Sequence, residues 1–305
     1  MTSRSPAHRQ PSESALEHVA SPSRTATTAA LPWHDYLRRI GHTGPLEPTA
    51  EYLRAVTTAH LHAVPYEFLD VLDGAVPDLE HTAAFDRVVR RRRGGTCLET
   101  TPLLGRFLRG VGFRARLVAA QMWRVGGEWW SRWDHLVLVV EAEGEDWLVD
   151  VGFLLHSPTE PLRLSGTPQA DGGWRFRVVE RDGYRTVLRS GVDDEWTPVY
   201  RFADEPLEIP DYAWIVDFHL TSEESPLSYT VLCSRVVPGG KLVVLGENFL
   251  RSLDGRDRTE FLADPADAEK ALGEVLHGHP HLLAEAVGAW EKARADRREN
   301  KRKFI

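Results

Sequence analysis

Cys97 is the residue of this sequence best suited to covalent chemistry. It lies in the stretch Arg90–Pro102 (RRRRGGTCLETTP), one residue beyond the pair Gly94-Gly95 and at the start of an apolar segment predicted to be helical. The positive end of a helix, its unpaired N–H groups and the preceding arginines all favour a thiolate. Glycines without side chains leave room for a substrate to approach the backbone. The pattern predicts a reactive thiol, and its alternative is a small buried residue that starts a helix.

A reactive thiol needs a base and an orienting carboxylate, and a predicted hairpin offers both. His135 opens the apolar run HLVLVV, and Asp150 lies in WLVDVGF. A two-residue turn at Glu143-Gly144 makes His135 face Gly152, so that His135 and Asp150 become diagonal neighbours on one face. A turn with an odd number of residues would separate them. Buried among Leu and Val, the two polar side chains are expected to satisfy each other, as a catalytic pair or as a structural one.

Three tryptophans, Trp129, Trp130 and Trp133, come just before His135. Trp130 and Trp133 are candidates for an aromatic wall that holds a substrate. The alternative is packing at the edge of a barrel.

Other candidates for chemistry carry weaker patterns. His60 and His62 stand on a predicted helix, where residues two apart do not share a face. The run His277–His281 has no acidic or cysteine residues at ligand spacing. We therefore predict no metal site. Cys233, in an alternating strand, is expected to be a core residue.

Composition excludes several classes of protein. The chain has 305 residues, two cysteines and a net charge of −8. Distant, unpaired cysteines indicate a reducing, cytoplasmic setting, and the acidic balance argues against a nucleic-acid partner. No apolar run approaches the roughly 20 residues that span a bilayer, so no membrane association is expected. Residues 1–30, rich in Ser, Thr, Ala and Pro, are predicted to be a disordered leader.

Periodicity divides the remainder into three predicted domains. Residues 31–112 form a helical domain that carries the nucleophile, with helices over Trp33–Ile40, Pro48–Val64, Phe85–Arg92 and Leu98–Gly110. Residues 113–218 form an antiparallel β-barrel or sandwich that carries His135 and Asp150. Residues 219–305 form an α/β lid: strands SYTVLCSRVV and KLVVLGENFL, then helices over Ala266–Leu276 and from His281 onward.

These motifs together resemble the arylamine N-acetyltransferase family. The resemblance runs from Trp33 to about Leu276 and rests on YLRRIG, VPYEFLDV, RGGTCLE, DHLVLVV, WLVDVGF, WTPVYRF and the proline-glycine hairpin after SYTVLCSRVV. It implies an α+β fold with an N-terminal helical bundle, a central antiparallel β-barrel, a C-terminal α/β lid and a papain-like cysteine triad.

The resemblance also assigns roles to individual residues. Cys97 matches the family's nucleophile, His135 its base and Asp150 its orienting acid. Gly94, Gly95, Gly152 and Phe153 match positions around the acyl-CoA site. Framework positions beside the nucleophile are matched by Glu67, Arg93 and Glu99.

The implied activity is transfer of an acyl group, by default acetyl from acetyl-CoA, through a Cys97 thioester onto an aromatic amine. The implied mechanism is ping-pong, and no tightly bound cofactor is expected. Three positions depart from the family motifs: Phe68, Thr101 and Leu154. They favour, as an alternative, an amide synthase of antibiotic pathways that takes a larger acyl group from an acyl carrier protein or CoA. A third hypothesis, an inactive interaction module, is disfavoured by the intact Cys, His and Asp.

Overall fold

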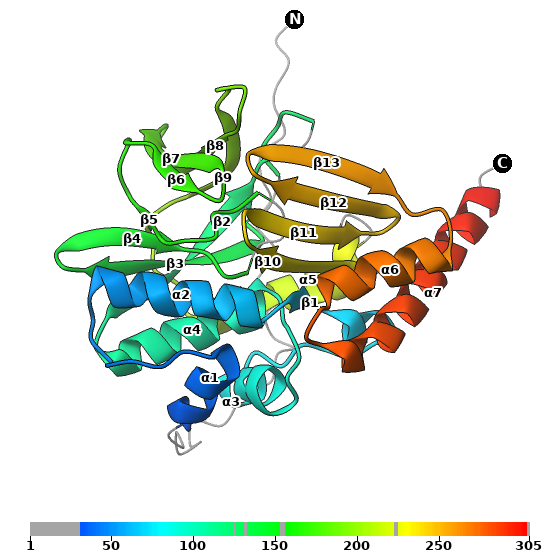
Figure 1. Cartoon of the computed structure of the whole chain (residues 1–305), viewed down its shortest axis with the longest axis horizontal. Helices are drawn as coiled ribbons and strands as arrows, with labels where there is room; N and C mark the ends of the chain where they lie inside the picture. The colour runs from blue at the N-terminus through cyan, green and yellow to red at the C-terminus, as the bar shows by residue number, and fades with distance from the viewer. Residues whose placement is uncertain (1–30, 125, 131–132, 153–155, 223–224, 304–305) are drawn as a thin grey trace, which may run out of the picture. The chain divides into compact units, whose positions relative to one another are not determined.

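The computed structural model describes residues 31–303, apart from 125, 131–132, 153–155 and 223–224 (Figure 1). The expected leader, residues 1–30, and the positions Phe153 and Leu154 lie outside the described residues. Residues Pro32–Ile305 belong to one compact unit. The predicted division of this unit into three domains stays a prediction.

Helices make up most of the first third of the unit. They are α1 (Trp33–Ile40), α2 (Ala50–Ala63), α3 (His81–Phe85), a π-helical turn η3 (Asp86–Arg90) and α4 (Cys97–Val111). α1 has the predicted bounds and ends at Gly41, whose positive φ of 68° suits glycine. The single helix predicted over Phe85–Arg92 is instead the end of α3 followed by η3.

Eight antiparallel strands form the central sheet, in the order β5-β4-β3-β2-β9-β8-β7-β6. Their bounds are β2 Arg114–Met122, β3 His135–Ala142, β4 Glu145–Val149, β5 Leu162–Arg163, β6 Gln169–Asp171, β7 Trp174–Arg181, β8 Tyr184–Ser190 and β9 Thr197–Phe202. Val178 N–H of β7 donates to Ser165 C=O, 3.1 Å away, just beyond β5. The sheet therefore curls into a nearly closed barrel, and α4 packs against its strands β2 and β3.

A second antiparallel sheet has the order β1-β10-β11-β12-β13. Its strands are β1 Tyr66–Glu67, β10 Leu232–Val237, β11 Gly240–Leu245, β12 Asn248–Leu253 and β13 Arg256–Phe261. Helices α6 (Pro265–Val275) and α7 (Leu283–Lys303) cover one face, where Leu242 and Val244 join their hydrophobic core. A shorter helix, α5 (Trp214–Thr221), precedes this sheet in the chain. The α+β fold with a helical start, a barrel and a C-terminal sheet with helices is confirmed.

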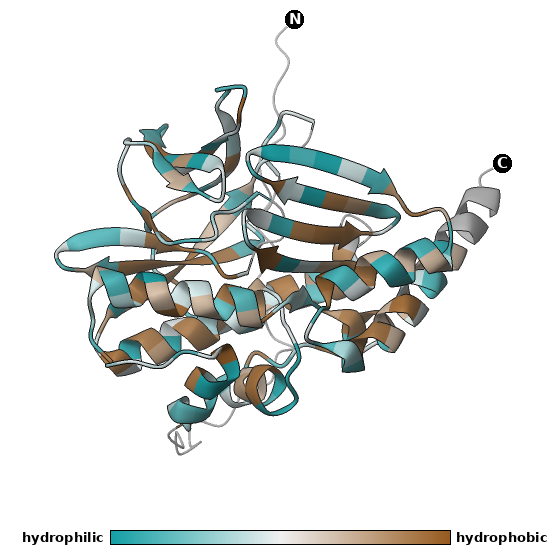
Figure 2. Ribbon diagram, in the orientation of Figure 1, coloured by the Kyte–Doolittle hydropathy of each residue, from teal (hydrophilic) through white to brown (hydrophobic). Residues whose placement is uncertain are grey.

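The sequence prediction was wrong about the number of strands in the second sheet. KLVVLGENFL was predicted as one strand, but Leu245 pairs with Asn248 across a turn at Gly246-Glu247, which makes it two. Strand β13 was missed because its six residues are all exposed and, apart from the last one, Phe261, hydrophilic, so the strand has no apolar face (Figure 2).

Candidate active site

Cys97 is the first residue of α4, one position earlier than predicted. A capping box fixes this helix start: Thr96 N–H donates to Glu99 Oε2 at 2.9 Å, and Leu98 N–H donates to Thr96 Oγ1 at 3.3 Å. The Cys97 side chain is 6% exposed. The thiol is thus held at the positive end of the helix dipole in a largely buried setting.

The β3–β4 hairpin has the register predicted for His135 and Asp150. Ala142 pairs with Glu145 and Leu138 with Val149, so the turn holds only Glu143 and Gly144, both with positive φ (54° and 79°). Just beyond the paired region, His135 Nε2 and Asp150 Oδ2 are 3.0 Å apart. Both side chains are buried, so the two polar groups satisfy each other as expected.

Charge is concentrated around the His135 ring. Burial alone would lower the pKa of His135, but the Asp150 carboxylate and the Cys97 thiol together raise it to about 10. Burial would raise the pKa of Asp150, yet His135, Lys241 and the Gly152 N–H lower it. The site therefore favours an imidazolium between a carboxylate and the thiol.

Tyr200 of β9 also contacts His135, although no local sequence pattern predicts this. Its ring meets the His135 ring edge-on, with 5.5 Å between centroids. Burial and the Asp150 carboxylate raise the pKa of Tyr200 well above its ordinary value, so the phenol stays neutral. It packs against the imidazole without adding charge.

Gly152 lies between the Asp150 carboxylate and Cys97. Its N–H donates to Asp150 Oδ1 at 3.1 Å. A Cβ added at this position would lie 2.4 Å from both Cα and Cβ of Cys97, so only glycine allows this approach. Close packing against Cys97 is thus the reason for a glycine here.

Gly94 and Gly95 have a different role from the one predicted. Both are buried, and neither is among the described residues that line the cavity around Cys97. A Cβ on Gly94 would lie 2.0 Å from Pro65 C=O, and Gly95 N–H donates to the same oxygen at 3.4 Å. The Pro65 backbone therefore occupies the space beside Gly94, and the side chains of Glu99 and Thr100 occupy the space beside Gly95.

A buried ion-pair network holds this region in place. Arg93 contacts Glu67 at 3.1 Å and Glu285 of α7 at 2.7 Å, and Arg87 contacts Glu67 at 3.0 Å. Gly94 N–H also donates to Glu67, at 2.9 Å. The predicted framework residues Glu67 and Arg93 therefore pair directly. Arg87 and Glu285 were missed, because nothing in their local sequence marks them as buried.

A cavity of about 540 Å³ opens on Cys97 and His135. Its described lining is mostly apolar and includes Tyr66, Leu98, Met122, Trp123, Trp130, Leu227, Leu232 and Leu245, together with Arg124, His219 and Gly152. Of the two predicted wall residues, Trp130 lines it. Trp133 does not: its ring lies against Tyr184 of β8, with 5.3 Å between centroids.

Two of the positions that depart from the family motifs are described, and both lie beside this cavity rather than in its lining. Phe68 is buried in a cluster with Leu227 and Leu232. Thr101 donates its hydroxyl hydrogen to Leu136 C=O at 3.3 Å.

The histidines weighed as metal ligands are placed elsewhere. His60 Nδ1 lies 2.7 Å from the Tyr36 hydroxyl in the helical core. Among the described residues, no group of three or more His, Cys, Asp or Glu side chains could hold a metal ion. The described helices also include none that is long and apolar enough to cross a membrane.

Comparison with known proteins agrees with this geometry. The N-acetyltransferase family profile matches residues 49–277. Arylamine N-acetyltransferase of Mycobacterium tuberculosis is 33% identical over 238 residues, 75% of this chain and 79% of that protein. Proansamycin X synthase of Amycolatopsis mediterranei is 28% identical over 249 residues, 80% of this chain and 96% of that protein.

Solved structures show the same relationship. The arylamine N-acetyltransferase of Mycobacterium marinum in complex with CoA has a TM-score of 0.73 and 30% identity, covering 86% of this chain and 97% of that one. The Salmonella typhimurium enzyme has a TM-score of 0.73 and 26% identity over 85% of this chain and 97% of that one. The profile, the relatives and the fold all lead to one conclusion: this chain is an acyltransferase that belongs to the arylamine N-acetyltransferase family.

Proposed function

We propose that the protein transfers an acetyl group from acetyl-CoA to an aromatic amine through a thioester on Cys97. The observation that carries the proposal is the hydrogen-bonded pair of His135 and Asp150, 3.0 Å apart, in a site where His135 and Cys97 line one cavity. A nucleophile, a base and an orienting acid are what a double-displacement acyl transfer requires.

In the first half-reaction, the Cys97 thiolate attacks the thioester carbonyl, and the CoA thiolate leaves with the proton that His135 carries. His135 Nε2 is engaged with Asp150, so Nδ1 is the nitrogen that faces this chemistry. The tetrahedral oxyanion needs a donor. The amides of Leu98, Glu99 and Thr100 are engaged with Thr96, which leaves the Cys97 amide at the helix start for this role.

In the second half-reaction, the amine nitrogen attacks the acyl-enzyme carbonyl. His135 accepts the amine's proton, the C–S bond breaks, and the Cys97 thiolate is restored beside the imidazolium. Asp150 fixes the imidazole tautomer and balances its positive charge. The site then returns to its starting protonation state.

The nature of the substrates follows from the cavity and from the relatives. The relative from M. marinum binds CoA in its solved structure, which supports CoA as the donor's leaving group. The wall made by Trp130, Trp123 and Tyr66 suits the flat face of an aromatic amine.

Steady-state kinetics test this proposal. Initial rates with acetyl-CoA and an arylamine such as aniline, each varied, should give parallel double-reciprocal lines, which indicate a ping-pong mechanism. Cys97→Ala should abolish turnover, whereas Cys233→Ala, at the other, fully buried cysteine, should retain it. Intersecting lines, or turnover by Cys97→Ala, would contradict the proposal.

Transfer of a larger acyl group is a second candidate, favoured by the size and lining of the cavity. About 540 Å³ bordered by Leu227, Leu232 and Leu245 exceeds the space that an acetyl group needs, and each buried methylene contributes about 0.8 kcal/mol. The match to proansamycin X synthase agrees with this candidate. An acyl carrier protein would then be an alternative donor.

Single-turnover acylation distinguishes the two candidates. Acetyl, butyryl and benzoyl thioesters of CoA are compared at equal concentration, and the adducts are followed by intact mass. Faster acylation by the longer or aromatic donors supports the second candidate. Fastest acylation by acetyl-CoA refutes it and leaves acetyl transfer.

A further inference from the structure

Lys241 is a buried lysine on the second sheet, and its side chain points toward the barrel. It lies on β11, where its neighbours Leu242 and Val244 face the core under α6 and α7. Strand alternation therefore directs Lys241 to the opposite face, the one on which Leu245 lines the cavity around Cys97. Only 3% of Lys241 is exposed. A lysine in such a position is costly unless charged partners surround it.

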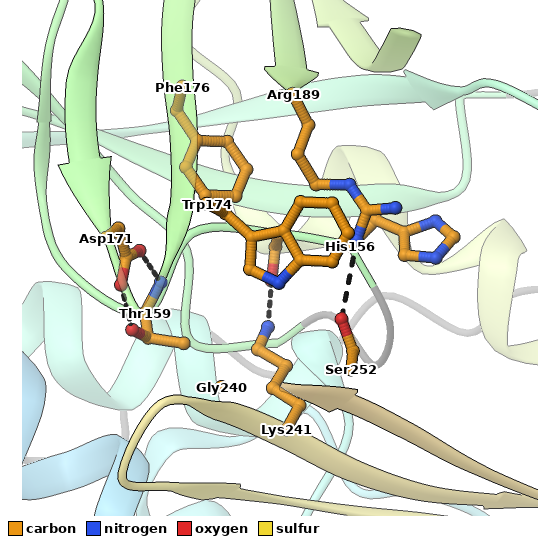
Figure 3. A pocket seen from close by; sticks show the side chains of 10 residues that line it. His156, Thr159, Asp171, Trp174, Phe176, Arg189, Gly240, Lys241 and Ser252 are labelled. Carbon is orange, nitrogen blue, oxygen red and sulfur yellow. Dashed lines mark hydrogen bonds between the residues drawn. The ribbon is translucent and has the colours of Figure 1, made fainter. Parts of the chain in front are cut away.

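The partners of Lys241 come from the barrel side (Figure 3). Its ammonium group donates to the Ser157 hydroxyl, in the segment that follows Asp150 along the chain. Figure 3 shows it pointing beneath the Trp174 ring, with Asp171 and Thr159 on one side. Asp171 accepts hydrogen bonds from Thr159, so its carboxylate holds the chain close to Ser157 in place.

Four charged or titratable groups either change the pKa of Lys241 or have their own pKa changed by it. Asp150 at the end of β4 and Asp171 of β6 attract the ammonium, while Arg189 of β8 opposes it. His156 also responds to its charge. Arg189 is itself compensated by Asp257 at 2.7 Å, which leaves the two barrel aspartates as the counter-ions of Lys241.

The charge of Lys241 acts on the proposed catalytic pair. After the contribution of His135, its ammonium is the next group that lowers the pKa of Asp150. Burial lowers the pKa of Lys241 itself to about 8, so its ammonium group is charged, and can act on Asp150, below that pH.

We propose that Lys241 is a positioning residue of the active site: its buried hydrogen bond joins Ser157 to the second sheet, and its ammonium group supplies a cation for the Asp150 carboxylate. This inference rests on the proposed function of Cys97, His135 and Asp150. It adds a residue from the C-terminal part of the chain to a triad supplied by α4 and the barrel.

The test is the pH dependence of Cys97 alkylation by iodoacetamide in full-length variants. Loss of a nearby cation raises the pKa of an acid, so Asp150 should accept a proton at higher pH in Lys241→Gln. The acid limb is the low-pH part of the curve, where the alkylation rate falls as the pH falls. In Lys241→Gln it should move to higher pH by about one unit, so that the rate at a fixed pH on this limb is about tenfold lower. Lys241→Met, which keeps the aliphatic stem, is the second neutral variant and should shift in the same direction.

Two further variants separate charge from packing. Lys241→Arg keeps the cation, so its acid limb should stay at the wild-type position. Arg189→Met removes a neighbouring cation whose direct partner is Asp257, so it should lower thermal stability and leave the acid limb in place.

Each outcome has one meaning. An unshifted acid limb in a folded neutral variant, or the same shift in Lys241→Arg, overturns the inference. Wild-type protein whose Cys97 is neither alkylated preferentially nor acylated by acetyl-CoA overturns the proposed function instead. The two failures are therefore distinguishable in one set of samples.

Discussion

His135 Nε2 and Asp150 Oδ2 lie 3.0 Å apart, at the end of a hairpin whose turn is only two residues long. The turn fixes the register, and the register puts both side chains on one face. Because Asp150 takes Nε2, the imidazole presents Nδ1 to the remaining partner, Cys97. One hydrogen bond thus sets the orientation, the tautomer and the charge of the proposed base.

Replacement of Asp150 by asparagine tests this relationship. Asp150→Asn keeps the size of the side chain but removes the negative charge that supports the imidazolium. We expect a folded protein whose acylation by acetyl-CoA is slower by about 10⁴-fold, as for the aspartate of other triads. Stopped-flow release of CoA measures this rate. A rate within threefold of wild type would mean that Asp150 does not orient the base.

The raised pKa of His135 predicts how stability depends on pH. Its pKa is about 10 in the folded protein and 6.5 as a free side chain. The stabilisation from the protonated ring is fully present below pH 6.5 and is lost as the pH rises toward 10. Urea unfolding of wild type and His135→Gln should therefore show a difference in free energy that shrinks from pH 6 to pH 10. A difference that is constant or grows over this range contradicts the ion pair.

The close contact of Gly152 with Cys97 predicts a steric effect. In Gly152→Ala the new Cβ would lie 2.4 Å from Cys97, so the nucleophile must move. We expect a loss of stability of about 1–3 kcal/mol and a loss of acylation rate on the order of 100-fold. Gly126→Ala is the matched control, because Gly126 lines the same cavity but its Cβ would meet nothing within 4 Å. Equal effects of the two substitutions would contradict the steric argument.

The two candidates for the aromatic wall, Trp130 and Trp133, are expected to differ in function. Trp130 lines the cavity, whereas Trp133 packs on Tyr184. Trp130→Ala should therefore raise KM for the amine at least several-fold. Trp133→Ala should lower the melting temperature and leave that KM close to wild type. Amine kinetics and thermal unfolding of both variants check this, and a reversed pattern would place the aromatic wall at Trp133.

Local patterns in the sequence were enough to predict the start of α4 and the His135–Asp150 hairpin. Both depend on short-range rules, helix capping and strand alternation around a tight turn. The network of Glu67, Arg87 and Glu285 could not be predicted in the same way. Its members are up to 218 residues apart, from 67 to 285, and meet only once α7 has folded back.

The dependence on long-range packing also explains why the prediction at Gly94 failed and why Lys241 was not singled out. Gly94 was expected to leave space for a substrate, but tertiary folding brings Pro65 into that space. Lys241 stands in an ordinary strand pattern, and nothing nearby in the sequence shows that it faces Ser157, which lies between β4 and β5. Residue types and spacing therefore pointed to the proposed reacting groups, while long-range packing determines what surrounds them.

Detection of an acyl-enzyme is the most direct test of the central claim. The protein is mixed with acetyl-CoA without any amine, quenched in acid and analysed by intact mass and peptide mapping. One acetyl group should be added on Cys97, be released on addition of an aromatic amine and be absent in Cys97→Ala. Unmodified protein that nevertheless acetylates amines, or an acetyl group carried by another residue, would contradict this claim.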